Sequence, residues 1–275
     1  MRTLNESIDR LEKGMAQALH KHLGAVGINT WEDVTRSSLY ELRDYMADTL
    51  APGSQKTILA NLKAIFKRVK DDVEIPSDYA EILSVKGDTC RSTYLTPEEL
   101  KAFEAVQVKG RKARIVQVES LIEAYTGARI SDVMTFTEEN FTTEGYLTYT
   151  SKKTKVTATI PVSEKTRGWI LYAQEHRGDE PTKMSRTRII RRIAKDAGIT
   201  KMVKTRRGGI EKTTPKYEVI SSHSFRKSCA TNLVMAGASL TEAKICLGHT
   251  NEAMTSRYVV ATRPNLSKEA MRYFM

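Results

Sequence analysis

The chain has 275 residues, of which 40% are hydrophobic, and this size suits one large or two modest domains with proper cores. Its 44 lysine and arginine residues outnumber its 33 aspartate and glutamate residues, and the net charge of +11 favours a nucleic-acid partner over a membrane surface. No apolar run has the length of a membrane span or of a signal peptide, and three cysteines without a Cys-x-x-Cys pair argue against a disulfide framework. We therefore expect a protein of the reducing cytoplasm. From charge alone, a basic protein that binds no nucleic acid is about as well supported as a nucleic-acid binder.

The first part of the chain is predicted to be helical throughout. Residues 4–22 carry apolar residues at helical spacing, and further helices are expected after Thr30 and after Ser37. The clearest helix begins near Ser54, a suitable N-cap, and has an apolar stripe along residues 58–69. Another face of this helix carries lysines at helical spacing, which in isolation indicates a solvated surface. These lysines are Lys56, Lys63, Lys67 and Lys70.

Residues 76–93 interrupt the helical pattern with proline, glycine and serine. We expect a first domain over residues 1–84, a linker over residues 85–93 and a second domain over residues 94–275. At the start of the second domain, Thr96 is predicted to cap a helix, with proline at the first helical position and glutamate completing a capping box.

The second domain is predicted to mix helices with hairpins. Apolar residues from Ile115 to Tyr125 mark a buried helix that ends at Gly127, and β-branched and aromatic runs at 146–150 and 156–160 mark a hairpin around a lysine-rich turn. Helices follow near residues 164–176 and 186–197, and the second of them is rich in arginine. Its arginines are Arg186, Arg188, Arg191 and Arg192.

The last third continues this alternation. Residues 201–217 are predicted to form a second hairpin, and a helix over about residues 225–237 follows it. We expect a short helix capped by Thr241 and a final one, begun by Asn251, that carries Tyr258. The fold class is therefore mainly α with small β-hairpins, an α+β arrangement.

Cations and imidazoles in this second domain occur in short motifs upstream of one tyrosine. An arginine follows Thr-Gly-Ala, a lysine stands in Ser-Lys-Lys-Thr, and a His-x-x-Arg pair is followed by Leu-Gly-His with a tyrosine nine residues on. The residues are Arg129, Lys153, His223, Arg226, His249 and Tyr258.

These residue types suit attack on a phosphodiester. A planar guanidinium binds two phosphate oxygens at once, and a lysine with a lowered pKa can protonate an expelled 5′ oxygen. A tyrosine phenol, with a pKa of about 10, is a weak nucleophile at neutral pH and needs such help. Because phosphate-ester cleavage is extremely slow without catalysis, a cluster of cations is expected, and such a cluster removes the need for a metal.

Each of these residues also has an ordinary explanation when taken alone. Arg129 suits a helix end, Lys153 a solvated turn and Tyr258 a core position. A metal site is a further alternative, but the spacing of its potential ligands matches no zinc pattern. Those ligands are His223, Cys229, Cys246 and His249.

The motifs taken together resemble the tyrosine recombinase, or phage integrase, family, in the version found in mobile elements. In the first motif Asp132 matches the acidic residue with which the family braces its first arginine. The lysine turn is followed by Ile160-Pro161, and the His-x-x-Arg motif by Ala-Thr-Asn-Leu. The resemblance spans about residues 94–260, and the helical first part is similar to the family's core-binding domain.

This resemblance implies site-specific strand exchange on double-stranded DNA through a 3′-phosphotyrosyl intermediate, with no cofactor and no metal. It also implies a tetramer on paired DNA sites, a monomer or dimer when free, no membrane partner, and a bacterial or phage-encoded protein associated with the nucleoid. With a phosphate site present, the lysine and arginine faces listed above are expected to contact DNA. The implied roles are Tyr258 as nucleophile, Arg129 and Arg226 as phosphate ligands helped by His249, Lys153 as general acid, and His223 as acid or base.

Three other functions remain open on sequence alone. A type IB topoisomerase would share the tyrosine attack but relax DNA without pairing two sites. A non-catalytic regulator would use residues 225–247 as a helix-turn-helix, and a metal-dependent nuclease would fail in chelator. The sequence also predicts a short tail helix, capped by Ser267, that must dock on a larger surface. Docking on its own domain stays open, and the resemblance favours docking on a neighbouring protomer.

Overall fold

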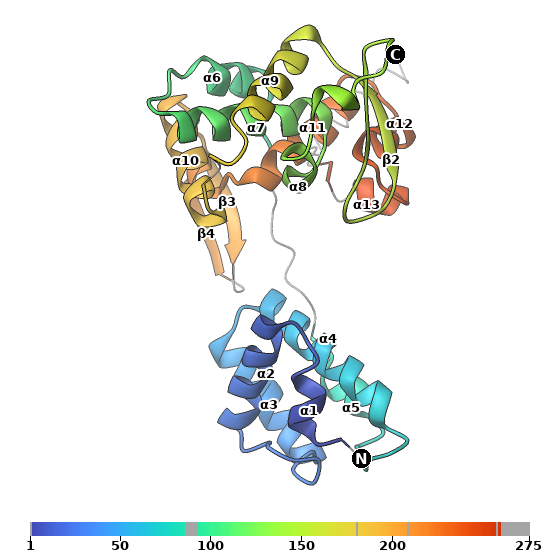
Figure 1. The fold of residues 1–275 in the computed structure, drawn as a ribbon. Coiled ribbons are helices and arrows are strands. Elements are labelled where there is room, and N and C mark those ends of the chain that lie inside the picture. Colours follow the sequence, from blue (N-terminus) through green and yellow to red (C-terminus); the bar gives the residue numbers. More distant parts are fainter. Residues whose placement is uncertain (1, 86–92, 180, 208–209, 257, 260–275) are drawn as a thin grey trace, which may run out of the picture. The chain divides into compact units, whose positions relative to one another are not determined.

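The chain divides into two compact units, one of residues 1–91 with residues 204–212 and the other of residues 92–203 with residues 213–275 (Figure 1). The computed structural model describes residues 2–85, 93–179, 181–207, 210–256 and 258–259. The expected linker over 85–93 and the expected tail helix therefore lie almost entirely outside the described residues.

The first unit begins with two helices where the sequence predicted one over residues 4–22. Helix α1 (Leu4–Ile8) ends in a turn, and α2 (Lys13–Ala25) follows it. In one straight helix, Leu4 and Leu23 would lie about 28 Å apart, at 1.5 Å per residue. The turn places both side chains in a single core, where they are 1% and 2% exposed.

The helix predicted after Thr30 is also absent from this part of the chain. The Asp33 carboxylate accepts hydrogen bonds from the backbone N–H groups of Asn29 (2.9 Å) and Thr30 (2.8 Å), and these bonds hold a turn instead. Helix α3 (Arg36–Thr49) follows it and is capped by Thr35.

Helix α4 (Pro52–Val69) is the longest helix described in this unit, and it begins before the predicted cap. Its N-cap is Ala51 and not Ser54, because Pro52 occupies the first helical position, where a missing N–H costs nothing. A short helix, α5 (Tyr79–Ile82), then returns the chain to the same core.

The second unit is built around α7 (Arg111–Thr126), which is buried on nearly all sides and ends at Gly127 (Figure 1). Tyr125 is an exception to the predicted buried stripe, since it is 44% exposed. The Thr96 capping box is confirmed and starts the first of the surrounding helices. The helices that pack on α7 are α6 (Pro97–Ala105), α8 (Ile130–Val133), α9 (Glu164–Glu175), α10 (Lys183–Asp196) and α11 (Ser222–Met235).

Two hairpins are present, as predicted. Strands β1 (Tyr146–Thr150) and β2 (Thr157–Pro161) pair antiparallel with Thr150 opposite Thr157, and they bury Leu147 and Ile160. Strands β3 (Met202–Arg207) and β4 (Ile210–Pro215) form the second pair.

The last described elements are two short helices, and both differ from expectation. Helix α12 (Leu240–Leu247) is capped by Ser239 rather than Thr241, because the Ser239 hydroxyl and Glu242 form a reciprocal capping box. Helix α13 (Glu252–Ser256) ends before Tyr258, which lies in the turn that follows. Among the described helices, none combines the length and the apolar composition needed to cross a membrane.

Candidate active site

Arg226 lies in the interior of the second unit, on the first half of α11, and is 0% exposed. Its Nη1 donates to the carbonyl of Gly127 and its Nη2 donates to the carbonyl of Leu247 (2.7 Å), so the ends of α7 and α12 hold the guanidinium. Burial and the charge of Arg129 lower its pKa, yet an arginine stays charged in proteins. Its Nε is buried and has no partner in the described part of the chain. An orphaned buried donor is costly, and an anion oxygen would satisfy it.

Arg129 immediately precedes α8 and is half-buried. Its Nη1 donates to the Ser151 hydroxyl (3.0 Å), and that hydroxyl donates to Asp132 (3.0 Å). Asp132 also accepts from the backbone N–H of Lys152 (3.0 Å). Asp132 therefore braces the arginine through a serine that sequence reasoning missed, and it anchors the lysine turn at the same time.

Lys153 is exposed in the turn between β1 and β2, with Lys152 and Lys155 beside it. Its charge is one of those that lower the pKa of His223, which brings this lysine to the imidazole side of the site. The turn is fixed near α12, because the Thr154 hydroxyl donates to the carbonyl of Gly248 (3.5 Å).

His249 is 3% exposed and lies between Arg226 and Thr255. Its Nε2 is 2.8 Å from Nη2 of Arg226, which can only donate, so Nε2 must accept. Burial is the main cause that lowers the pKa of this histidine to about 4, and the charges of Arg226 and Arg129 add to it. A neutral ring that accepts at Nε2 carries its proton on Nδ1, which then donates to the Thr255 hydroxyl (3.0 Å). Thr255 is a second residue that sequence reasoning missed.

His223, in the first turn of α11, is more exposed, yet it too is held neutral. Partial desolvation, then the charges of Lys227, Arg226, Arg129 and Lys153, lower its pKa to about 4. A neutral imidazole at pH 7 can accept a proton.

Tyr258 lies among these groups. Its ring centroid is 4.9 Å from that of His223 and 4.8 Å from that of His249, and the Arg226 guanidinium lies 5.5 Å from it. Its backbone is held by hydrogen bonds to Thr255 and Thr231. The structure thus gathers the motif residues that sequence reasoning selected into one cluster.

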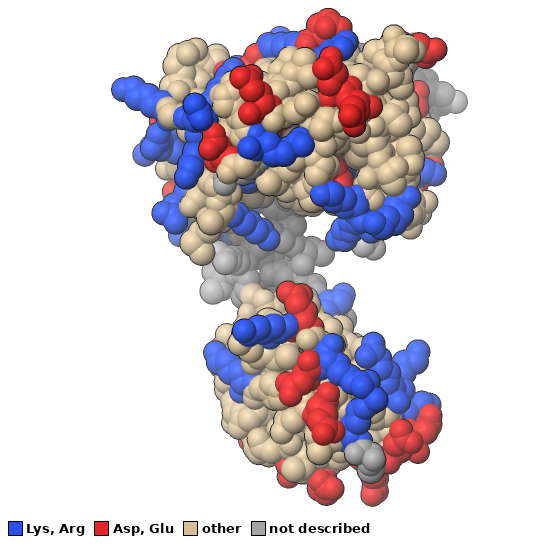
Figure 2. Space-filling view, viewed as in Figure 1, with Lys and Arg blue, Asp and Glu red and all other residues tan. Residues whose placement is uncertain are grey.

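The residues expected to contact DNA are distributed differently. Lys56 and Lys67 are exposed on α4, Lys70 is exposed just past its end, and Lys63 is half-buried. Figure 2 shows lysine and arginine side chains on both units, interspersed with aspartate and glutamate side chains. On α10, by contrast, Arg186 is 6% exposed and its Nη1 donates to Glu119. Arg186 is therefore not on the surface where we expected it. The other arginines of this helix, Arg188, Arg191 and Arg192, are exposed.

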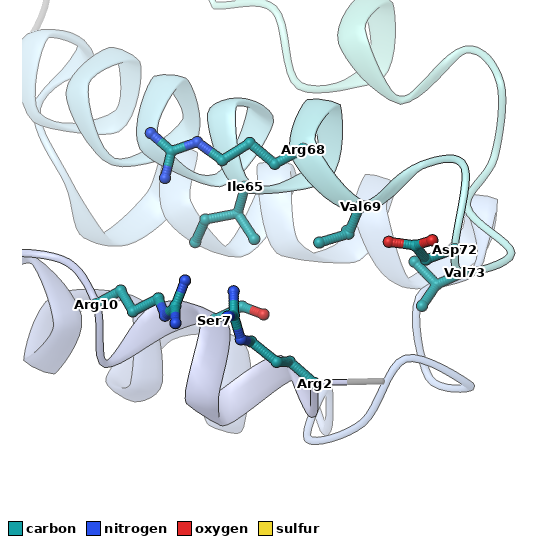
Figure 3. Close-up of a pocket in the computed structure, with 8 residues that line it drawn as sticks. All are labelled: Arg2, Ser7, Arg10, Ile65, Arg68, Val69, Asp72 and Val73. Atoms are coloured by element: carbon teal, nitrogen blue, oxygen red, sulfur yellow. The ribbon is translucent and has the colours of Figure 1, made fainter.

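The first unit also has a cavity of about 370 Å³ that sequence reasoning did not single out. Arg68 reaches it from α4, while Arg2 and Arg10 approach from either side of α1, with Ile65 and Val69 between them (Figure 3). None of the three guanidinium groups forms an ion pair within the described part of the chain. Because the three arginines share no periodic spacing, the sequence offered no signal for the cavity. The carboxylate of Asp72 also lines the cavity, and we assign the cavity no part in strand cleavage (Figure 3).

Within the described residues, no group of three or more histidine, cysteine, aspartate or glutamate side chains is placed to hold a metal ion. Cys90, the first of the cysteines, lies outside those residues.

A tyrosine in contact with two imidazoles and a buried arginine thus lies within a mainly helical unit. The model of the phage integrase family matches residues 93–263, and the chain belongs to that family. It is a tyrosine recombinase, an enzyme that cleaves and rejoins DNA.

Solved structures share this fold at low identity. The Tn1549 transposon integrase in complex with transposon right-end DNA has a TM-score of 0.68 at 17% identity, over 100% of each chain. A lambda integrase dimer bound to a COC′ core site has a TM-score of 0.66 at 19% identity, over 94% of this chain and 95% of that one. A lambda integrase tetramer bound to a Holliday junction has a TM-score of 0.63 at 18% identity, over 94% and 77%. Comparison with curated protein sequences gives no match.

Proposed function

We propose that this recombinase cleaves DNA with Tyr258, whose hydroxyl oxygen attacks a backbone phosphorus. A 3′-phosphotyrosine bond forms, the bond from phosphorus to the 5′ oxygen breaks, and a 5′-hydroxyl is released. The 5′-hydroxyl of a partner strand then attacks the phosphotyrosine and frees Tyr258, so no nucleotide cofactor is consumed. The observation that carries this proposal is the contact of the Tyr258 ring with His223, His249 and Arg226.

Arg129 and Arg226 are the proposed ligands of the scissile phosphate. The unpartnered Nε of Arg226 supports this role, because a phosphate oxygen would supply the acceptor that the protein lacks. In this structure Nε2 of His249 accepts from Arg226, so it can donate to a phosphate oxygen only after that contact breaks and Nε2 gains a proton. Charge that builds on the non-bridging oxygens would favour both changes.

Lys153 and His223 are the proposed proton-transfer groups. His223, with a pKa near 4, is neutral at pH 7 and is placed beside Tyr258 to accept the phenol proton. Lys153 lies in an exposed turn and would donate a proton to the departing 5′ oxygen.

Double-stranded DNA and further copies of this chain are the partners. The lambda integrase and Tn1549 integrase structures contain DNA, and lambda integrase is also seen as a dimer and as a tetramer on a Holliday junction. We extend that behaviour to this chain: a monomer or dimer when free, and a tetramer on paired sites. The reaction belongs in the cytoplasm of a bacterial host, on nucleoid or phage DNA.

We assign DNA binding and catalysis to separate domains, each with its own core. Residues 1–84 form the proposed core-type DNA-binding domain, and residues 94–275 the catalytic domain with its tail. The exposed lysines of α4 and the exposed arginines of α10 are the proposed phosphate contacts. Arg186 is left out of this set, because it is buried against Glu119.

Covalent capture tests the chemistry and finds the DNA site together. The protein is incubated with a library of nicked suicide duplexes of randomised sequence, and the duplexes in denaturant-stable adducts are recovered and sequenced. Wild type should capture a defined sequence, with the bond mapped to Tyr258. Tyr258→Phe should form no adduct yet bind the recovered duplex within a few-fold. An adduct on another residue contradicts the assignment.

The recovered duplex also separates the other functions. A recombinase exchanges strands between two such duplexes in EDTA. Relaxation of supercoils without recombinant product would indicate a topoisomerase, binding without an adduct a regulator, and complete loss in EDTA a metal-dependent nuclease.

A further inference from the structure

A buried carboxyl group lies behind the active site, where the proposed chemistry does not use it. Glu123 is in the last turn of α7 and is 2% exposed. The hydroxyl of Ser222 donates to its Oε2 at 2.6 Å. Ser222 is the first residue of α11, the helix whose first turns carry His223 and Arg226.

Glu123 is linked to the site a second time, through its backbone. Its carbonyl accepts the N–H of Gly127 (2.9 Å), and the carbonyl of Gly127 in turn accepts Nη1 of Arg226. The last turn of α7 therefore contacts α11 at two points, one beside His223 and one at the guanidinium that would bind phosphate.

We infer that Glu123 is a positioning residue of this recombinase: its carboxyl group, through Ser222, holds the first turns of α11 where His223 and Arg226 meet the scissile phosphate. This inference rests on the proposed function of Tyr258 and the arginines. It adds a residue that touches neither the DNA nor the reacting atoms.

Burial and the charges around Glu123 decide whether its carboxyl group is neutral or ionised while it holds α11 in place. Burial raises its pKa to about 8, opposed by the Ser222 hydrogen bond and by Arg186 of α10 and Arg226 of α11, with Glu119 of its own helix adding to the rise. At neutral pH the group is therefore mostly a neutral acid. Ionisation would place a negative charge behind Arg226 and draw that guanidinium away from the phosphate.

Two substitutions of the full-length chain separate these effects. Glu123→Gln keeps the size and the acceptor oxygen but cannot ionise, whereas Glu123→Asp can ionise but is one methylene short of Ser222. The rate of adduct formation is measured from pH 6 to 9 on the duplex recovered by covalent capture. Urea unfolding at each pH reports on the fold.

Glu123→Gln should match wild type within about twofold at pH 7. At pH 9 it should be about tenfold faster, because a group with a pKa of about 8 is then about nine-tenths ionised in wild type. Glu123→Asp and Ser222→Ala should each lose on the order of tenfold at pH 7, since small displacements of catalytic groups are costly. Ser228→Ala is the matched control: it removes a buried hydroxyl of the same helix that contacts Leu95, and it should leave the pH profile unchanged.

Identical pH profiles for wild type and Glu123→Gln, or a normal rate for folded Glu123→Asp, would overturn the inference. A wild-type protein that forms no adduct at any pH would instead overturn the proposed function.

Discussion

At the scale of single residues, the site gathers positive charges that a bound phosphate would neutralise. His223 and His249 both have a pKa of about 4, mainly from desolvation and then from the cations around them. Their unfolded pKa is higher, near 6.5, so protonation favours the unfolded chain and stability should fall as the pH drops from about 6.5 toward 4. A phosphate bound by the arginines would offset the repulsion and raise both values.

The first prediction is that DNA binding takes up protons at these two histidines. If binding raises their pKa, the affinity for DNA should increase as the pH falls from 7 toward the raised value. Nitrogen-15 imidazole signals of Tyr258→Phe protein, titrated with and without the captured duplex, measure this directly. Titration curves that coincide with and without DNA would contradict the prediction.

The second prediction is that Lys153 protonates the leaving oxygen. Lys153→Ala should cleave normal DNA slowly but cleave DNA with a 5′-bridging sulfur at nearly the wild-type rate, since a thiolate leaves without a proton. Lys152→Ala and Lys155→Ala are controls from the same turn, and neither should show this rescue. Rescue of either control instead of Lys153→Ala would move the assignment to that lysine.

The residues that gather in the cluster could be selected from the sequence because the proposed reaction limits their types, but the residues that hold them could not. Ser151 and Glu123 bond to side chains far along the chain, whereas Thr255 bonds to nearby His249. In each case a serine, threonine or glutamate carries no signal of its own in the sequence. The error at Arg186 has the same cause. Its spacing suits a basic helix face, and only folding brings it to Glu119.

At the scale of elements, the junction of α7 with α11 and α12 depends on one glycine. Gly127 has φ +68, and a Cβ there would lie 2.8 Å from Cδ2 of Leu247 and 3.1 Å from Sγ of Cys229. The position therefore requires glycine for conformation and for space, while its carbonyl holds Arg226.

The third prediction is that Gly127→Ala destabilises the protein by about 2–4 kcal/mol, combining left-handed strain with overpacking. Gly198→Ala is the matched control, with φ +74 but nothing within 4 Å of the added carbon, and it should cost only about 1–2 kcal/mol. Urea unfolding measures both, and only Gly127→Ala should also slow adduct formation. Equal losses in the two variants would show that close packing at Gly127 does not matter.

The fourth prediction concerns the lysine face of α4. If Lys56, Lys63 and Lys67 each contact a phosphate, changing all three to glutamine should reduce the slope of log affinity against log salt by about 2.7. Changing Arg2, Arg10 and Arg68 to glutamine removes the same charge from the cavity, and that slope should stay at the wild-type value. Arg68 is one residue beyond Lys67 and therefore about 100° further around the helix. A larger loss of slope in the arginine variant would place the DNA on the cavity side.

Elements with strong local signals were predicted well, and elements decided by packing were not. The Thr96 capping box and both hairpins follow from residues adjacent in sequence. The break after α1 and the start of α4 at Pro52 depend on the core that the helices share and on the choice between two plausible caps. Helix periodicity continues across such a break, so the pattern alone could not place it.

At the scale of the whole molecule, two separate cores argue for two folding units. One core gathers the helices of the first unit, and the other gathers α7 with the elements around it. Family membership was predictable because the motifs lie in order across the second unit, whereas the helical first unit carries no motif of comparable specificity. We expect the contacts that assemble protomers on DNA to lie on exposed surfaces of the two units.

Helix α12 leaves one such surface. Its Ile245 is 54% exposed and is close in sequence to His249. The tail beyond Thr262 lies outside the described residues, but its sequence predicts a short helix with apolar residues on one side, too short to be stable alone. We expect this tail to cover the α12 surface of a neighbouring protomer.

The fifth prediction is that truncation after Thr262 and Ile245→Glu have the same effect. Each protein should fold and bind a single DNA site, but each should lose cooperative assembly and recombination. The reason is that a charge at position 245 and the loss of the tail both remove the contact between the tail and α12. Tyr146→Glu, which changes a 40% exposed aromatic residue at the start of β1, should recombine normally. Mixing the truncated protein with Ile245→Glu then decides between docking within and between protomers. A tail from Ile245→Glu can reach an intact surface on a truncated neighbour, so partial recovery of recombination indicates docking in trans. No recovery, or full activity of the truncated protein alone, contradicts it.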